Sequence, residues 1–216
     1  MESIIQTITV YALPVLFGIT LHEAAHGYVA RMFGDPTAYQ MGRVSLNPVR
    51  HVDPVGTIVV PLVLLLSTKL MGGAGLLFGW AKPVPVDWSR LRNPKKDMLW
   101  VALAGPGSNM VMAIMWALSL RFLIEFGATP TDFWVRMAIA GIQVNLILMA
   151  LNLLPLPPLD GGRIVFSLLP GKAAYQYSRL EPYGLMIIIV LMLTGVLWTI
   201  LQPLLMLGQG IVRWFL

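Results

Sequence analysis

The chain has 216 residues, of which 57% are hydrophobic and 12% are charged, about half the charged share of an average soluble protein. With a mean hydropathy of +0.75, one aqueous core cannot bury this much apolar side chain, so most of it must face lipid. The formal charge of +5 includes no block of like charges that would suggest a nucleic-acid partner, and the absence of cysteine excludes disulfides and thiolate metal ligands.

Apolar segments of about 20 residues predict transmembrane helices. We expect an all-α, polytopic integral membrane protein with about four full spans, and residues 1–216 to form a single membrane domain. The expected spans are residues 8–30, 98–122, 137–154 and 183–201. The final residues, 204–216, are expected to form an interfacial helix, with Arg213 and Trp214 at the level of the lipid headgroups.

Residues 41–80 are harder to interpret. Residues 41–60 mix Gly, Pro and Asn with alternating apolar residues, which predicts a short strand pair on the membrane surface. Residues 55–80 are apolar but are interrupted by Thr68, Lys69 and a glycine-rich stretch. Their uninterrupted apolar part is too short for a comfortable span, so we expect a re-entrant hairpin.

The distribution of positive charge tests whether residues 55–80 cross the membrane. If they cross, the basic residues divide six to eight between the two faces, which barely orients the chain. If they enter and leave on one face, that face carries eleven basic residues and the other three, with Lys69 set aside in the hairpin. This favours a re-entrant hairpin, an external N-terminus and a basic cytoplasmic face. Five plain spans are the alternative.

His22, Glu23 and His26 form an HEAAH motif inside the first expected span. Positions i and i+4 share one helical face, so both imidazoles can bind one metal ion, while Glu23 can address a water molecule at the metal. The alternative is a chance match in which the histidines only satisfy polar contacts. Ionisable groups inside membrane helices are costly and usually functional, so the motif predicts a zinc site.

A catalytic zinc ion usually has three protein ligands, and His51 and Asp160 are the candidates for the third. Asp160 is the better one, because three prolines precede it and leave irregular backbone at membrane depth, which is tolerated only when buried or lining a cavity. A re-entrant hairpin would bring Asp160 to the same face as His22; a crossing one would separate them. Asp160 as a simple helix cap is the alternative.

Three motifs together resemble the site-2 protease family of intramembrane zinc metalloproteases: HEAAH at 22–26, AGPGSN at 104–109 and NLLPLPPLDGG at 152–162. The resemblance covers most of the chain and implies a minimal member without a soluble regulatory domain. It implies one Zn²⁺ per chain, held by His22, His26 and Asp160, with Glu23 as general base. The site would lie near the cytoplasmic face.

The resemblance also implies a substrate and residues that bind it. The substrate would be a transmembrane protein in the lipid bilayer, cleaved within or near its membrane helix in regulated intramembrane proteolysis. Asn152 matches an asparagine that holds the substrate backbone, and Asn109 and Gly105 match the packing motif of the neighbouring core helix. Asn109 and His51 are further candidates for substrate binding, His51 as a contact to the oxyanion; a satisfied loop histidine is the alternative.

Two other functions compete with proteolysis. A metal-ion or proton transporter could use the same His and Asp groups, with residues 155–158 as a broken helix. The lack of an internal repeat and of a polar path through the membrane argues against it. A scaffold that has lost catalysis is the third reading, but the predicted ligands and Glu23 are all present. The sequence gives no indication of the oligomeric state.

Overall fold

The computed structural model describes residues 4–59, 63 and 82–216. The expected all-α fold is confirmed, because these residues form helices, turns and irregular segments but no strand. The α-helices are α1 (Ile4–Met32), α2 (Thr37–Gln40), α4 (Pro94–Glu125), α5 (Phe133–Asn152), α6 (Asp160–Leu168), α7 (Gly171–Ser178), α8 (Glu181–Leu193) and α9 (Val196–Val212). The shorter helical turns are η1 (Pro48–His51), η2 (Pro54–Val59), η3 (Trp88–Arg90) and η4 (Arg213–Phe215).

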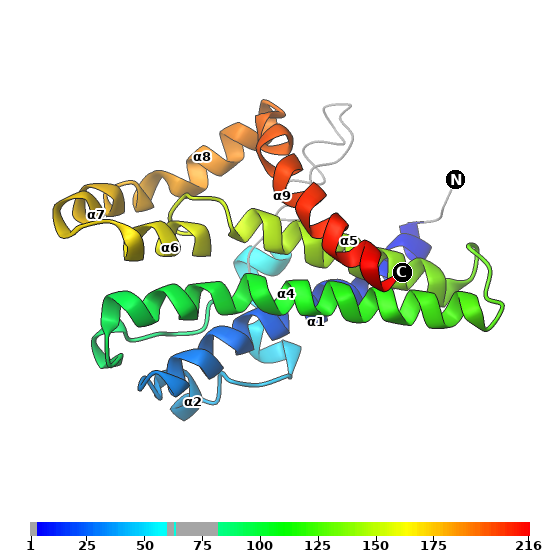
Figure 1. Ribbon diagram of the computed structural model, residues 1–216, viewed down its shortest axis with the longest axis horizontal. Coiled ribbons are helices and arrows are strands. Elements are labelled where there is room, and N and C mark those ends of the chain that lie inside the picture. The colour runs from blue at the N-terminus through cyan, green and yellow to red at the C-terminus, as the bar shows by residue number, and fades with distance from the viewer. Residues whose placement is uncertain (1–3, 60–62, 64–81) are drawn as a thin grey trace.

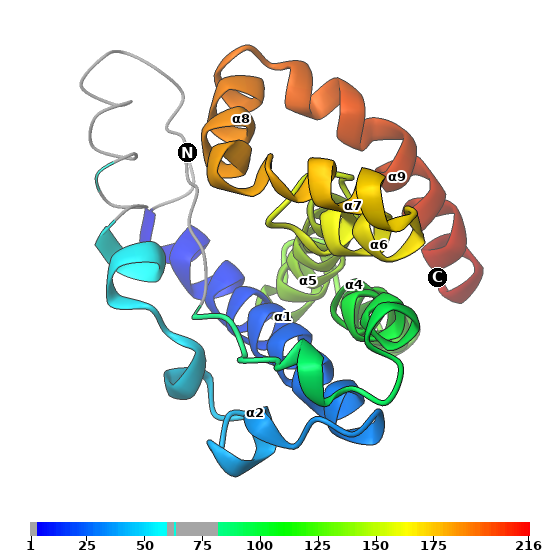
Figure 2. The same ribbon diagram turned by 90° about the vertical axis from the view of Figure 1, so that its left-hand side faces the viewer.

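Helices α1, α4 and α5 pack against one another as the core of the molecule (Figure 1). Small buried residues, including Ala113 and Ala117 on α4 and Gly141 on α5, allow close approach. A Cβ on Gly141 would lie 2.3 Å from the Trp116 ring. Lipid tails are as apolar as the helix surfaces, so the hydrophobic effect does not hold membrane helices together. Close van der Waals packing does so instead. Viewed along the core, α6 to α9 cover one side of it (Figure 2).

Four helices within the described residues are long and apolar enough to cross a membrane: Gln6–Met32, Pro94–Glu125, Phe133–Asn152 and Val196–Phe215. The first three coincide with the expected spans at 8–30, 98–122 and 137–154, which are therefore helical over nearly their whole length. Because α4 runs back along α1 and α5 returns again (Figure 1), the end of α1, the start of α4 and the end of α5 share one end of the molecule.

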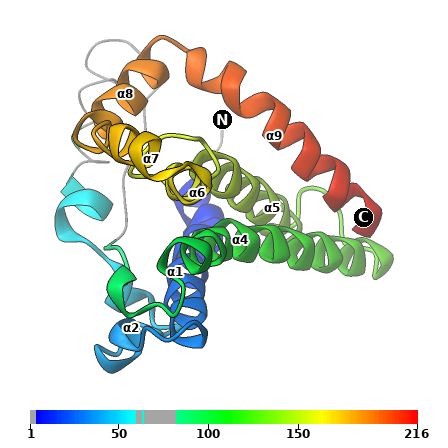
Figure 3. The ribbon, with the colours of Figure 1, turned by 60° about the vertical axis from the view of Figure 1, so that its left-hand side comes forward.

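The fourth expected span, 183–201, is wrong. Gly195 has a φ of 75°, a left-handed conformation that a continuous helix cannot contain. Helix α8 therefore ends at Leu193 and α9 begins at Val196, and the two helices meet at an angle (Figure 3). The long apolar helix is instead Val196–Phe215, so residues 204–216 belong to a candidate span and not to a separate interfacial helix.

The strand pair expected at 41–60 is not found in the described part of that segment, residues 41–59, which contains turns, η1 and η2. Two side chains favour these turns: Asn47 accepts from Val49 N at 3.1 Å, and Asp53 accepts from Gly56 N at 2.7 Å. Pro48 and Pro54 also lack the N–H that a strand ladder needs. Most of the predicted re-entrant hairpin, residues 55–80, lies outside the described residues.

An irregular segment, residues 82–87, runs beside α1 and is called the 82–87 segment below. Its backbone is held at both ends: Lys82 N donates to His51 O at 2.9 Å, and Asp87 N donates to the Asp35 carboxylate at 2.7 Å. Arg43 donates to Lys82 O at 2.8 Å. The segment is thereby fixed next to the C-terminal half of α1.

Candidate metal centre

His22, His26 and Asp160 meet at the shared end of the helical core. His22 and His26 lie one turn apart on α1, and Asp160 is the first residue of α6. The two Nε2 atoms are 3.1 Å apart, and Asp160 Oδ2 lies 3.1 Å from His22 Nε2 and 3.2 Å from His26 Nε2. All three residues are buried. Among the described residues, this trio forms a group that could hold a metal ion.

The loop between α5 and α6 explains how Asp160 reaches the histidines. Helix α5 ends at Asn152, and the proline-containing residues 153–159 turn the chain back. A Cβ on Gly161 would lie 2.2 Å from Leu154 O, and one on Gly162 would lie 2.5 Å from Pro157 N. Only glycine therefore allows the first turn of α6 to pack against this loop, which fixes Asp160 in place.

Hydrogen bonds on the far side of each imidazole determine where its proton lies. The amide nitrogen of Asn109 is 3.0 Å from Gly18 O, which can only accept, so the amide oxygen faces His22 Nδ1 at 2.7 Å. His26 Nδ1 lies 2.7 Å from Val101 O. Both Nδ1 atoms must donate, so in the neutral rings both Nε2 atoms present lone pairs to Asp160.

The Asp160 carboxylate completes a cluster of three electron-pair donors. Its Oδ2 is buried and has no hydrogen-bond donor. A single proton could form a hydrogen bond between only two of these three atoms and would leave the third unpaired. A cation between them satisfies all three, and tetrahedral zinc would place its ligand atoms about 3.3 Å apart, close to what is observed.

Gly105 on α4 leaves the room that the imidazoles need. A Cβ at this position would lie 2.4 Å from His26 Nε2 and 2.6 Å from His22 Nε2. The packing role expected for Gly105 thus has a definite physical reason: α4 approaches the metal-binding face of α1 too closely for any side chain.

Glu23 follows His22 on α1 and is half-buried. Its Oε2 accepts a hydrogen bond of 2.7 Å from Val84 N in the 82–87 segment. Residues 83 and 85 are prolines and have no N–H, so Val84 supplies the backbone donor at this point. Glu23 is therefore held beside the trio of ligands without joining it.

The other predicted site residues differ in their contacts, and of these only Asn109 has a described hydrogen bond to the ligand trio. Asn152 donates to Leu148 O at 2.9 Å within its own helix. His51 is outside the ligand trio; its Nε2 lies 2.9 Å from Ser45 O, and its buried Nδ1 has no hydrogen-bond partner. Asn109 is fully buried. Asn145, which contacts Asn109 at 3.0 Å, was not predicted, although an amide in an apolar span is itself a signal.

Comparison with known proteins identifies the family. Residues 123–195, which include Asp160, match the model of peptidase family M50. The chain is 37% identical over 205 residues to "Putative zinc metalloprotease YwhC" of Bacillus subtilis, covering 91% of this chain and 86% of the relative. It is 30% identical over 184 residues to "Putative zinc metalloprotease Rip2" of Mycolicibacterium smegmatis, covering 84% and 66%. No solved structure matches the chain.

The similarity to zinc metalloproteases and the geometry of the ligand trio point to the same kind of protein. A relative at 37% identity spans nearly the whole chain, and the ligand trio has the donor atoms and spacing that zinc requires. With its four candidate spans, the protein is a multi-pass membrane protein and a zinc metalloendopeptidase. The chain belongs to peptidase family M50, the site-2 protease family.

Proposed function

We propose that this zinc metalloendopeptidase hydrolyses peptide bonds within or near the transmembrane helices of membrane-protein substrates. The observation that carries the proposal is the position of the ligand trio: His22 and His26 lie within a candidate span, and they and Asp160 are buried in the helical core. A peptidase built for soluble chains would not need to place its costly polar groups there.

Each residue of the centre has a definite task. His22, His26 and Asp160 would hold zinc, which supplies a Lewis acid for the scissile carbonyl and lowers the pKa of water to about 7. Glu23 accepts a proton from the attacking water and delivers it to the leaving amine. Because Val84 N–H engages Oε2, the carboxylate is oriented and Oε1 is available for the proton.

The substrate must expose its backbone before cleavage. A helix hides its carbonyls in i to i−4 hydrogen bonds, so the substrate segment has to unwind next to the zinc. Asn152, at the end of α5 and before the Asp160 loop, would bind the freed backbone. With Nε2–H given to Ser45 O, the neutral His51 ring offers an acceptor at Nδ1, which suits a substrate N–H better than an oxyanion.

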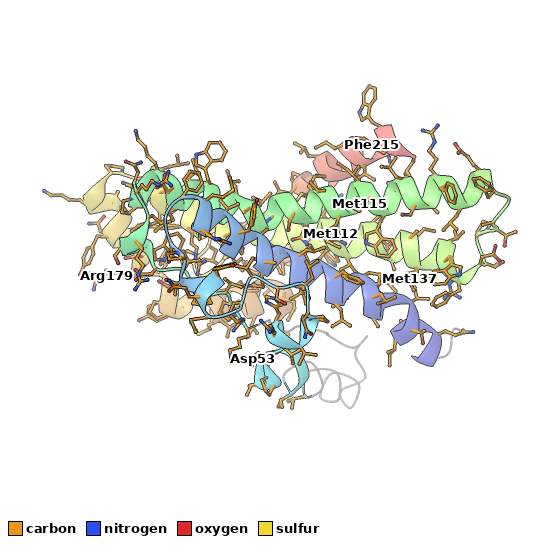
Figure 4. All side chains as sticks on the ribbon, turned by 90° about the horizontal axis from the view of Figure 1, so that it is seen from below. Asp53, Met112, Met115, Met137, Arg179 and Phe215 are labelled. Carbon is orange, nitrogen blue, oxygen red and sulfur yellow. The ribbon has the colours of Figure 1, made fainter. Side chains whose placement is uncertain are left out.

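The charges support an external N-terminus and a site toward the cytoplasm. The end of the molecule where α1 finishes carries a group of basic residues: Arg31, Arg90, Arg92, Lys95, Lys96, Arg163, Lys172 and Arg179. The opposite end, where α4 finishes and α5 begins, carries Arg121 and Arg136. Arg179 and Met137 mark these two ends (Figure 4). Basic loops are retained in the cytoplasm.

Glu23→Gln tests the proposed function in the purified full-length protein, reconstituted with a model transmembrane substrate. We expect cleavage to fall by about 100-fold or more, the usual scale of general acid–base catalysis, while the zinc content is unchanged. Cleavage at the original rate would refute the role of Glu23. A metal flux that persists in this variant would favour the transporter.

Asn152→Ala tests substrate binding in the same assay. We expect slower cleavage of the transmembrane substrate with full zinc occupancy; loss of zinc would show that Asn152 supports the metal site instead. A soluble peptide with the same scissile sequence is the comparison. If the wild-type protein cleaves the peptide but not the transmembrane substrate, the intramembrane part of the proposal is wrong.

A further inference from the structure

A chain of buried amides connects α5 to the zinc-binding face of α1. Asn145 on α5 donates to Gly141 O at 2.9 Å and accepts from the Asn109 amide at 3.0 Å. Asn109 on α4 also donates to Gly18 O on α1 at 3.0 Å, and its oxygen lies 2.7 Å from His22 Nδ1. Asn109 and Asn145 have 0% exposure. The relay therefore joins all three core helices without access to water.

Backbone carbonyls set the direction of this relay. Gly141 O can only accept, so the amide nitrogen of Asn145 must face it and the amide oxygen must face Asn109. Asn109 consequently presents its nitrogen to Asn145 and Gly18, and its oxygen to His22. With these orientations, both N–H groups and the oxygen of the Asn109 amide have complementary partners, and the last link requires a proton on His22 Nδ1.

We propose that Asn145 is a positioning residue for the zinc centre. It holds the amide of Asn109 in the orientation that keeps the proton of His22 on Nδ1 and the Nε2 lone pair toward the metal. The inference rests on the assignment of His22 as a zinc ligand. Asn109 then belongs to the support of the metal site, and not to the substrate-binding surface.

The physical reason lies in the second N–H of the Asn109 amide. Without Asn145, that N–H stays buried and unpaired, which costs about 1–3 kcal/mol. Without its partner on α5, the Asn109 amide is held less firmly in this orientation, and a rotated amide no longer presents its oxygen to His22 Nδ1. The imidazole is then free to turn or to carry its proton on Nε2, where a metal cannot bind. Loss of such outer partners typically lowers metal affinity about 10- to 100-fold.

Asn145→Leu and Asn145→Asp separate this role from general packing. Leu removes every polar contact, whereas Asp, as the neutral acid in this buried site, keeps an oxygen facing Asn109 and an O–H for Gly141 O. The zinc dissociation constant of the full-length, detergent-solubilised protein is measured by competition with a chelator. We expect Asn145→Leu to weaken zinc binding about 10- to 100-fold and Asn145→Asp to stay within a few-fold of the wild type. If Asn145→Leu does not fold, Asn145→Ala replaces it in the same comparison.

Leu146→Ala provides the control on the same helix. Leu146 is buried in a cluster with Ala113, Met149 and Val212, so its truncation lowers the thermal unfolding temperature without touching the relay. We expect this variant to bind zinc normally. Absorption of the Co²⁺-loaded proteins gives a second readout: the cobalt ligand-field bands should change in Asn145→Leu and stay unchanged in Leu146→Ala.

Two results would overturn the inference. One is wild-type zinc affinity and an unchanged cobalt spectrum in Asn145→Leu. The other is an equal loss of affinity in Leu146→Ala. His22→Ala distinguishes this failure from failure of the proposed site: if His22→Ala loses zinc but Asn145→Leu does not, the role of Asn145 alone is wrong. If His22→Ala also binds zinc normally, the ligand assignment itself fails.

Discussion

The absence of a side chain at Gly105 leaves the space that the metal site needs. It lies on the face of α4 that covers both imidazoles, and a Cβ there would lie 2.4 Å from His26 Nε2, the nearest atom. The near atoms are the ones that could hold the metal, so the helix cannot relieve the clash by moving a dispensable group. Gly105 has no side chain that could take part in chemistry, yet it allows α4 to lie against both imidazoles.

We expect Gly105→Ala to weaken zinc binding by about 10- to 100-fold, because overpacking a tight site typically costs about 1–3 kcal/mol. Chelator competition measures the change. Gly107→Ala, two residues along the same helix, is the matched control, since a Cβ there meets no atom within 4 Å. Alanine favours a helix over glycine, so the control should keep its zinc and unfold at the same or a higher temperature. Equal affinities in both variants would contradict the steric argument.

How well each of these residues could be predicted depends on whether its partners lie nearby in the sequence or on another helix. His22, Glu23 and His26 could be predicted because their relation is one turn of a single helix. Asp160 required topology and the proline-rich context as well. Asn145 could not be placed, because its partner depends on which face of α5 meets α4, and both helices are apolar on nearly every side. The apolar pattern of a membrane helix carries little information about its inner face.

Among the larger elements, the 82–87 segment has the most direct influence on the site. It is tied to residues His51, Arg43 and Asp35, and in its middle Val84 N–H reaches Glu23. The Val84 side chain is itself buried, close to Gly27 of α1. The segment thus fixes the orientation of the proposed general base from outside the helix that carries it.

Val84→Pro removes that N–H. A residue that precedes a proline already favours the extended backbone that proline adopts, so the substitution changes the donor more than the path of the chain. We expect cleavage to slow about 10-fold or more, since hydrogen bonds to charged groups contribute about 1.5–3 kcal/mol, with unchanged zinc content. Val84→Ala, which keeps the N–H and loses buried side chain, is the control. If it slows cleavage as much as Val84→Pro, packing and not the hydrogen bond positions Glu23.

Helices α8 and α9 show where hydropathy is misleading. Residues 183–201 form one apolar run in the sequence, yet the left-handed Gly195 divides it. Glycine is tolerated inside apolar helices, so its presence does not by itself predict a break. The conformation depends on how α8 and α9 pack against neighbouring parts of the protein: a Cβ on Gly184 of α8 would lie 1.7 Å from Pro157 O, and Gly208 of α9 lies against Leu146 of α5.

At the scale of the whole molecule, the antiparallel arrangement of α1, α4 and α5 places the zinc ligands and most basic loops at one end. The chain contains no cysteine, so single-cysteine variants can test the orientation directly. Thr131→Cys, in the exposed turn between α4 and α5, should react with a membrane-impermeant maleimide on intact cells. Lys172→Cys, exposed on α7, should react only after permeabilisation. The opposite pattern would place the active site outside the cell.

Zinc binding should also stabilise the packing of α6 against the core formed by α1, α4 and α5. Asp160 belongs to α6, which packs on α4 and α7, whereas the histidines belong to α1. A metal ion shared by these three residues would therefore link α1 to α6 through side chains. A ligand that binds only the folded state contributes about 4 kcal/mol at 1,000 times its dissociation constant. Removing zinc should lower the unfolding temperature and loosen α6 more than the α1–α4–α5 core.

Hydrogen exchange of the full-length protein in detergent, with zinc and after chelation, measures that difference. We expect faster exchange in residues 160–168 after chelation and little change in the middle of α4 and α5, whose small buried residues pack without the metal. His22→Ala should exchange like the chelated wild type in either condition. If chelation instead loosens all three core helices equally, zinc would be part of the core's own stability and not a link between the core and α6.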